Sequence, residues 1–167
     1  NDIAKVIALE IDRVALYGTG AANEPLGLHN TAGIGSEAIT ANNPTFAQVV
    51  NMESDVASAN ALMGNLAYIT GATIRGAMKV RTKDSGSGQF LWGGDNTVNG
   101  YPAYMSNQVE AGDILFGNWS DCIIGYWSSL DLLVDPYTHS TSGTIRITAL
   151  QDVDVAFRHA ASYSLGA

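Results

Sequence analysis

The hydrophobic residues at the start of the chain follow a helical period. Ile3, Ile7, Ile11 and Val14 recur three or four positions apart, and Asp12 lies on another face. This spacing predicts an amphipathic helix over residues 1–18. Because the helix begins abruptly and the first residue is not a methionine, we expect that upstream sequence is missing and that the chain is a fragment.

A glycine-rich turn follows this helix. The stretch LYGTGAANEPLGL (16–28) contains Gly18-Thr19-Gly20, which looks like a phosphate-binding loop. A dinucleotide fingerprint needs a third glycine where Asn23 stands, a strand before the loop and a helix after it. Here a helix precedes the loop. We interpret the glycines as a helix stop, with Gly18 in the left-handed conformation that ends many helices.

The rest of the chain alternates between helical and extended patterns. A second amphipathic helix opens at Pro44-Thr45 and ends near Gly64-Asn65, and a buried strand (66–70) and a short helix (71–80) follow. Two flexible loops, 83–88 and 93–100, flank a hairpin-like strand at 89–92. Short strands are then predicted at 101–106, 113–119, 122–127, 130–134, 144–150 and 152–160. Helices first and strands afterwards predict an α+β fold.

Composition narrows the class of protein. The chain has 167 residues, 46% of them hydrophobic, which suits a domain with a real core. No apolar run approaches the roughly 20 residues of a membrane helix, so we expect no membrane partner. Cys122 is the single cysteine, which excludes a disulfide within the chain and cysteine-pair metal motifs.

The charges are unevenly distributed. The net charge is −8, and so acidic a chain is not expected to bind nucleic acid through the phosphates. Arg75, Lys79, Arg81 and Lys83 carry half of the positive charge, whereas no Lys or Arg occurs between Asp84 and Ile145. Either this pattern is a solvated helix end followed by an acidic sheet, or it lets one face of a molecule attract a neighbour.

Candidate catalytic groups are few. Asp152 and Asp154 fall on one side of a predicted strand, and with His159 they would suit a small acidic hydrolase, provided that all three converge in one pocket. The wet face of a strand gives the same pattern without chemistry. The three histidines lack the spacing of a metal site.

The aromatic residues suggest another class of function. Trp119, Tyr126 and Trp127 would serve a carbohydrate- or protein-binding β module if their rings were exposed in a row. Alternation along the strands predicts that some of these rings pack in the core instead.

Several segments in order resemble the major capsid proteins of tailed bacteriophages, the Hong Kong phage type. They are EIDRVALYGTGAANEPLGL (10–28), the helix–strand–helix stretch TFAQVVNMESDVASANALMGNLAYITGATIRGAMKV, EAGDILFGNWSDCIIGYW (110–127) and TALQDVDVAFRHAASYSL (148–165). The resemblance covers essentially the whole chain. It implies a C-terminal fragment of a capsid subunit, without the N-terminal arm and extended loop that clamp neighbours in the family.

The resemblance implies a phage capsid-type fold with two parts. Residues 1–44 and 144–167 would form a partial peripheral domain with a spine helix and a returning strand. Residues 45–143 would form a mixed α/β axial domain that points toward the symmetry axes.

The function implied is structural. The protein would be a virion component of a phage or prophage head that assembles in the cytoplasm of the host bacterium. Its partners would be other copies of itself, it would need no cofactor and would have no catalytic or metal-binding residue, and the fragment alone would be a monomer or a small ring. A bacterial nanocompartment shell of the same fold is the alternative. The candidate contacts between subunits are Arg75, Lys79, Arg81, Lys83, Asp84, Asp95 and Asn96.

Overall fold

A six-stranded mixed sheet organises the larger part of the protein. The computed structural model describes residues 2–167, and the strands of this main sheet lie in the order β1-β10-β5-β2-β4-β3. Their bounds are β1 Gly35–Glu37, β2 Leu66–Thr70, β3 Thr97–Val98, β4 Tyr101–Met105, β5 Ile114–Asn118 and β10 Tyr163–Gly166. β10 joins the sheet from the end of the chain, antiparallel to β5 and parallel to β1.

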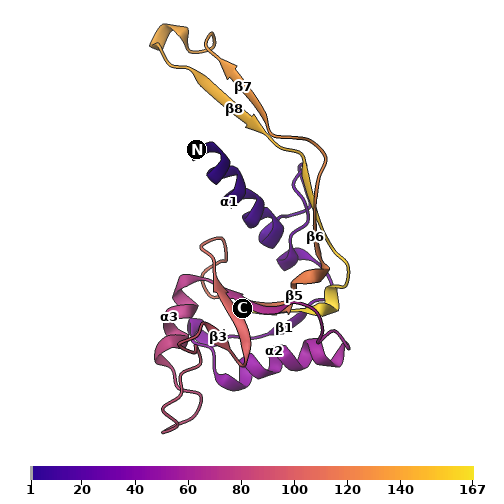
Figure 1. The fold of residues 1–167 in the computed structure, drawn as a ribbon, viewed down its shortest axis with the longest axis vertical. Helices are drawn as coiled ribbons and strands as arrows, with labels where there is room; N and C mark the ends of the chain where they lie inside the picture. Colours follow the sequence, from indigo (N-terminus) through magenta and orange to yellow (C-terminus); the bar gives the residue numbers. More distant parts are fainter. Residues whose placement is uncertain (1) are drawn as a thin grey trace.

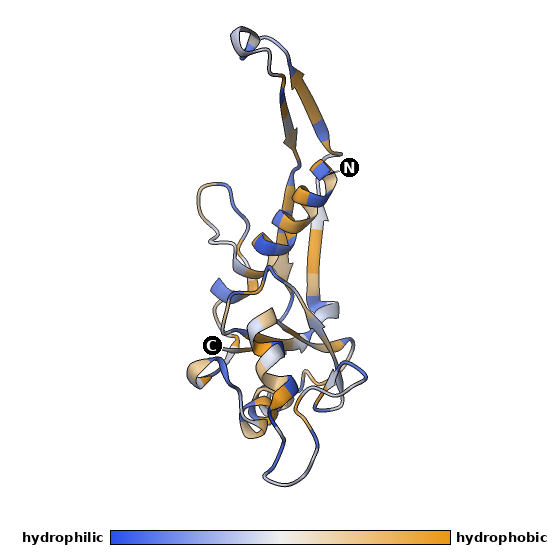
Figure 2. Ribbon diagram, turned by 90° about the vertical axis from the view of Figure 1, so that its left-hand side faces the viewer, coloured by the Kyte–Doolittle hydropathy of each residue, from blue (hydrophilic) through white to orange (hydrophobic). Residues whose placement is uncertain are grey.

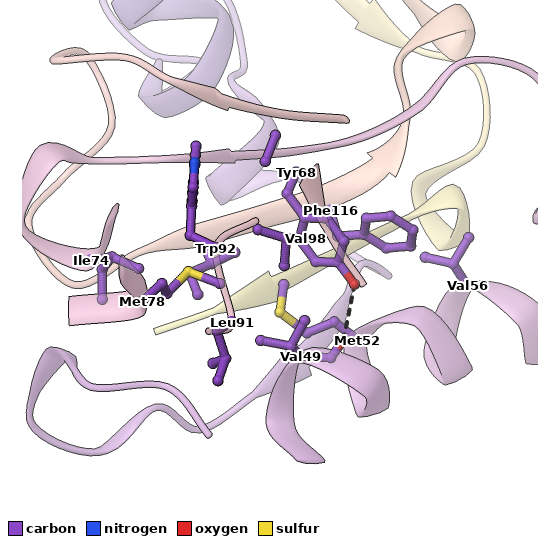
Figure 3. Close-up of a cluster of buried hydrophobic side chains, with 12 residues drawn as sticks. Val49, Met52, Val56, Tyr68, Ile74, Met78, Leu91, Trp92, Val98 and Phe116 are labelled. Atoms are coloured by element: carbon purple, nitrogen blue, oxygen red, sulfur yellow. Dashed lines mark hydrogen bonds between the residues drawn. The ribbon is translucent and has the colours of Figure 1, made fainter. Parts of the chain in front are cut away.

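Two helices cover one face of the main sheet. They are α2 (Phe46–Ser58) and α3 (Ala72–Val80). Thr45 begins α2 with a capping box, in which its side chain and that of Gln48 each bond the other residue's backbone N–H. The buried cluster on this face, shown in Figure 3, comprises Val49, Met52, Val56, Tyr68, Ile74, Met78, Leu91, Trp92, Val98, Ala103, Ile114 and Phe116. The apolar faces of both helices therefore supply the core that the sequence pattern predicted for them.

The opposite face of the sheet receives the end of the first helix. In α1 (Asp2–Tyr17) only the last turn is buried. Leu16 and Tyr17 pack with Leu28, Leu115 and Tyr163 in a second cluster. Because successive residues of β5 point to opposite faces, Leu115 belongs to this cluster and its neighbours Ile114 and Phe116 to the first.

A long two-stranded arm rises from the main lobe. Its lower part pairs β6 (Cys122–Tyr126) with β9 (Val153–Phe157), and its upper part pairs β7 (Asp131–Asp135) with β8 (Arg146–Leu150). Figure 1 shows α1 running beside the lower part of this arm, with the upper part extending beyond the helix. Side chains of α1 and of the arm line shared hollows, which places the apolar face of the helix against the arm.

The structure confirms the α+β class and most predicted elements, with three corrections. The helix α2 ends at Ser58, whereas the sequence pattern predicts its end near Gly64-Asn65. Gly18 is not left-handed; the residues with positive φ in this turn are Gly20, at +69°, Ala22 and Asn23. Residues 89–92 do not form a regular strand, because Phe90 and Trp92 make only isolated bridges to Thr82 and Val98. Within residues 2–167, no helix is long and apolar enough to cross a bilayer.

The main sheet crosses the predicted boundary between the two parts. β10 falls within the predicted peripheral residues 144–167, yet it pairs with β5, which falls within residues 45–143. Conversely, β6 and β7 lie in the arm with β8 and β9. The division into a peripheral and an axial domain stays a prediction.

Candidate functional site

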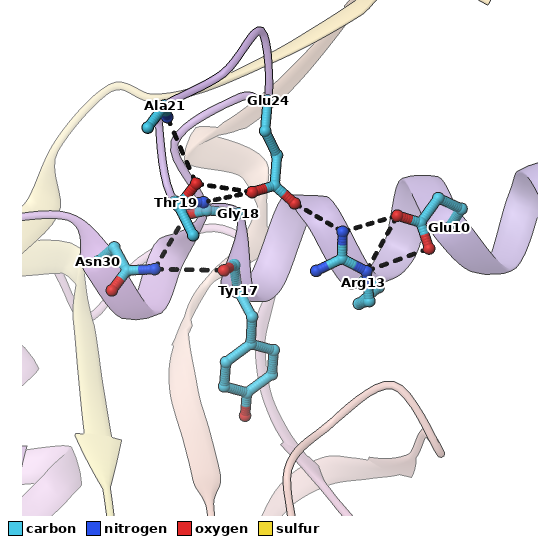
Figure 4. Close-up of polar contacts among 8 residues, drawn as sticks. All are labelled: Glu10, Arg13, Tyr17, Gly18, Thr19, Ala21, Glu24 and Asn30. Atoms are coloured by element: carbon cyan, nitrogen blue, oxygen red, sulfur yellow. Dashed lines mark hydrogen bonds and ion pairs between the residues drawn. The ribbon is translucent and has the colours of Figure 1, made fainter. Parts of the chain in front are cut away.

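The glycine-rich turn after α1 binds a carboxylate of its own chain. Glu24 accepts hydrogen bonds from the backbone N–H and the hydroxyl of Thr19, at 3.0 and 2.7 Å, and forms an ion pair with Arg13 at 2.6 Å (Figure 4). The Thr19 hydrogen bonds, with Arg13 second, lower the pKa of Glu24 to about 2. Glu24 therefore occupies the position that an anionic ligand would take, and the interpretation as a structural turn holds.

Close packing explains the two glycines at this junction. A Cβ on Gly18 would lie 2.2 Å from the carbonyl oxygen of Pro25, and one on Gly27 would lie 2.3 Å from the nitrogen of Gly18. The Gly27 N–H donates to the Gly18 carbonyl at 2.9 Å. The glycines are needed because two backbone segments touch here.

The proposed hydrolase residues do not converge. Asp152 and Asp154 are exposed at the start of β9, on its outward side. His159 lies past the other end of β9, in a hollow that it shares with Asp121 and Arg158. Asp152 and Asp154 do not line this hollow. The three side chains therefore do not share one pocket, as the hydrolase hypothesis requires.

Other reactive groups are similarly dispersed. Cys122 is half-buried, and burial raises the pKa of its thiol, which disfavours the nucleophilic thiolate. In the part of the chain that the structure describes, no three His, Cys, Asp or Glu side chains are grouped so that they could hold a metal ion.

The aromatic residues do not form an exposed row. Trp119 is half-buried, donates its indole N–H to the Ala67 carbonyl at 3.0 Å and packs edge-on against Tyr163. Tyr126 and Trp127 are exposed on the arm. Tyr126 lines the hollow against α1, whereas Trp127 folds back over Gly125. The ring arrangement of a carbohydrate-binding module is therefore absent from these three residues.

Three of the predicted contact residues line one hollow of about 420 Å³ beside α3. Arg75 is half-buried, and its guanidinium carbon lies 5.3 Å from the centre of the Trp92 ring. Asp95 and Asn96 lie on the loop at the rim, where Asp95 accepts from Thr97 at 2.6 Å and Asn96 from the Trp92 indole at 3.2 Å. The structure thus brings together a cation, an aromatic ring and two polar side chains.

Three others line a second hollow, next to the start of α2. Arg81 donates to the Asn43 carbonyl at 2.7 Å, and the Lys83 amine lies 5.4 Å from the centre of the Phe46 ring. Asp84 is exposed at the same rim, and Lys79, the seventh candidate, is exposed near the end of α3. The basic stretch is therefore more than a solvated helix end, since at least Arg75, Arg81 and Lys83 make defined contacts.

The upper part of the arm exposes many apolar side chains. The hydropathy colouring in Figure 2 shows apolar residues along both strands. The exposed apolar side chains in the strands and next to them are Leu132, Leu133, Val134, Tyr137, Ile145, Ile147 and Leu150. Contiguous exposed apolar surface of this kind is typical of regions that contact another molecule. The pattern of strands was visible in the sequence, but their lack of a covering layer was not.

Sequence reasoning also missed the ring under Arg75. The ring belongs to Trp92, and its contact with Arg75 depends on how the loop after α3 folds back. An arginine on a helix followed by a tryptophan near two glycines is too common a pattern to indicate such a pair.

The described part of the molecule presents surface that is available for contact with other molecules. It has hollows, an exposed apolar arm and, among residues 2–167, no gathered set of catalytic or metal-binding groups. Residues 1–166 match the phage capsid family, and the chain belongs to this family. It is 37% identical over 165 residues to the major capsid protein of Halomonas phage phiHAP-1; the match covers 99% of this chain and 27% of that protein.

Solved structures share the fold. The capsid of the native GTA particle superposes with a TM-score of 0.74 at 20% identity, over 99% of this chain and 63% of that one. The capsid of phage XM1 gives 0.70 at 11% identity, over 98% and 62%. A virus-like particle from Pyrococcus furiosus gives 0.61 at 8% identity, over 84% and 58%. The chain thus spans under two thirds of each of these relatives, and the phage capsid-type fold is confirmed.

Proposed function

We propose that this chain is part of a structural subunit of an icosahedral phage or prophage head, and that it functions by fitting against other copies of itself. The observation that carries the proposal is the family match over residues 1–166, together with a fold shared with capsids over 99% of the chain. The subunit acts in the virion, it assembles in the cytoplasm of the host bacterium, and no catalytic step is part of its role.

The surface of the chain supports this role. The apolar side chains of the upper arm are exposed in the single copy, and burying them against a neighbour would be favourable at about 25 cal/mol per Å² of apolar area. The seven polar candidates for subunit contacts, among them Arg75 and Lys83, lie on the main lobe, away from the arm. Contacts on two separate parts are what a subunit needs to meet several neighbours in a closed shell.

The test is to express the complete gene and to image the product by electron microscopy. Closed shells of uniform size are expected, and a product that stays as dispersed monomers under all assembly conditions would contradict the proposal. The contents separate the phage head from the alternative, a nanocompartment shell. A head holds nuclease-protected DNA when it is recovered from induced cells, whereas a nanocompartment holds protein.

A further inference from the structure

One edge of the main sheet is left uncovered beside Arg75. β3 pairs with β4 only at Tyr101 and Pro102, and β4 continues to Met105. The Ala103 N–H reaches the loop, donating to the Asn96 carbonyl at 2.8 Å. Past this bond no strand of the described residues pairs with the outer side of β4.

The backbone of Met105 faces this uncovered side. Ser106 donates its N–H to the Thr70 carbonyl of β2, at 3.1 Å. Because the N–H and C=O groups of successive strand residues point alternately to the two sides, those of Met105 point away from β2. A free strand edge of this kind is a template for another extended segment.

The uncovered edge forms one wall of the hollow of about 420 Å³ that Arg75 lines. Trp92, only 4% exposed, lies on the same hollow, and Tyr104 and Met105 flank it with exposed fractions of 60% and 42%. The hollow therefore combines backbone groups, apolar contact surface and one cation. When an extended segment adds to a sheet as a new strand, the backbone hydrogen bonds supply the affinity and the side-chain pockets supply the specificity.

Arg75 has no anionic partner among the residues that the structure describes. The ion pairs formed by residues 2–167 both involve Arg13, and the buried Nε of Arg75 makes no hydrogen bond to any described residue. Asp95 shares the hollow but is bound to Thr97. A guanidinium stacked on an aromatic ring keeps its outer N–H groups free and oriented for a carboxylate.

We propose that an extended, acidic segment of a second copy of this chain adds to the free edge of β4 and places a carboxylate against Arg75. The choice of a second copy rests on the proposed function, in which identical subunits surround one another. It also rests on charge. The chain has 16 acidic and 8 basic residues, and from Asp84 to Ile145 it has acidic residues and no Lys or Arg.

The test places a photo-crosslinking amino acid, p-benzoylphenylalanine, at Tyr104 of the full-length protein. Shells are assembled from a mixture of isotopically light and heavy subunits. Irradiation is expected to join position 104 to an acidic peptide of a differently labelled copy. Arg75→Gln should lower the yield of this product about tenfold, as the loss of a partly buried charge pair would. Arg158→Gln, the same change directly after β9 and outside this hollow, should leave the yield unchanged.

Further variants separate a contact from a folding defect. Arg75→Lys keeps the charge and should retain part of the yield, and thermal melts show whether each variant folds. If Arg75→Glu is combined with a change of the crosslinked acid to Arg, the yield should recover. The inference would be overturned if shells form but position 104 gives no crosslink, or crosslinks only to its own chain, to a foreign protein or to nucleic acid. The proposed function would not be affected by such a result. If the wild-type protein forms no shells, both fail.

Discussion

At the scale of single residues, the clearest result is that Glu24 completes the glycine turn. Its carboxylate is bound by Thr19 and Arg13, and Arg13 is also paired with Glu10 at 2.6 Å. The sequence showed that Gly18-Thr19-Gly20 lacks the dinucleotide pattern. The sequence did not show that the Glu24 side chain binds back to the loop. This contact depends on the reversal of chain direction at Ala22 and Asn23, which both have positive φ.

This carboxylate predicts a specific acid dependence of stability. The pKa of Glu24 is lowered to about 2, so the folded state favours the ionised group. Its stabilisation is complete above the ordinary carboxyl range and is lost as the pH falls toward 2. Glu24→Gln should therefore lower the free energy of unfolding at pH 7, and the gap to the wild type should close toward pH 2.5. Chemical denaturation between pH 7 and pH 2.5 measures this difference in the free energy of unfolding, with Glu110→Gln as the charge-matched control. A gap that stays constant with pH would contradict the assignment.

At the scale of elements, the local patterns explain why some parts could be predicted. α1 and α2 have helical apolar periods, and β9 alternates cleanly, so each was identified from its own residues. β1 and β10 were not predicted. β10, with the sequence YSLG, is buried along its whole length, and β1 has only the residues GSE. Both strands exist because partners distant in sequence bind them, such as Gly117 opposite Tyr163. The hollow at Arg75 depends on the same kind of long-range contact.

The junction between α1 and the main lobe gives an element-scale prediction. Gly27 has φ of −76°, which suits any residue, so its requirement for glycine is purely steric. Gly27→Ala should lower the free energy of unfolding by about 1–3 kcal/mol or more, because its Cβ would overlap the backbone of Gly18 and Tyr17. Gly76→Ala is the control. It lies within α3 with no atom within 4 Å of the new Cβ, and it should stabilise the protein by about 0.5–1 kcal/mol. Equal effects of the two substitutions would disprove the steric explanation.

At the scale of the whole molecule, the distribution of charge predicts how the chain behaves toward DNA. The net charge of −8 repels phosphates, and half of the positive residues lie between positions 75 and 83. Three of these make contacts within the chain, Arg75 with Trp92, Arg81 with the Asn43 carbonyl and Lys83 with Phe46. The chain has only 8 basic residues against 16 acidic ones, and Asp84 lies next to the basic stretch, so the net attraction for phosphates is weak. Weak adhesion of this kind agrees with the proposed function, because a shell around packed DNA benefits from subunits that do not bind the DNA.

We therefore expect that the chain binds duplex DNA with a Kd above about 10⁻⁴ M at physiological salt. This affinity is lower than that of typical non-specific DNA-binding proteins. Fluorescence anisotropy of a labelled duplex, titrated with the chain, measures this. The double variant Asp84→Asn, Asp95→Asn removes two anions next to the basic residues and should raise the affinity at low salt only, since the added attraction is screened over about 10 Å at 0.1 M salt. Micromolar binding by the wild type with a steep salt dependence would show instead that the basic stretch is a phosphate-binding surface. The same residues would then be expected to face the genome and not a neighbouring subunit.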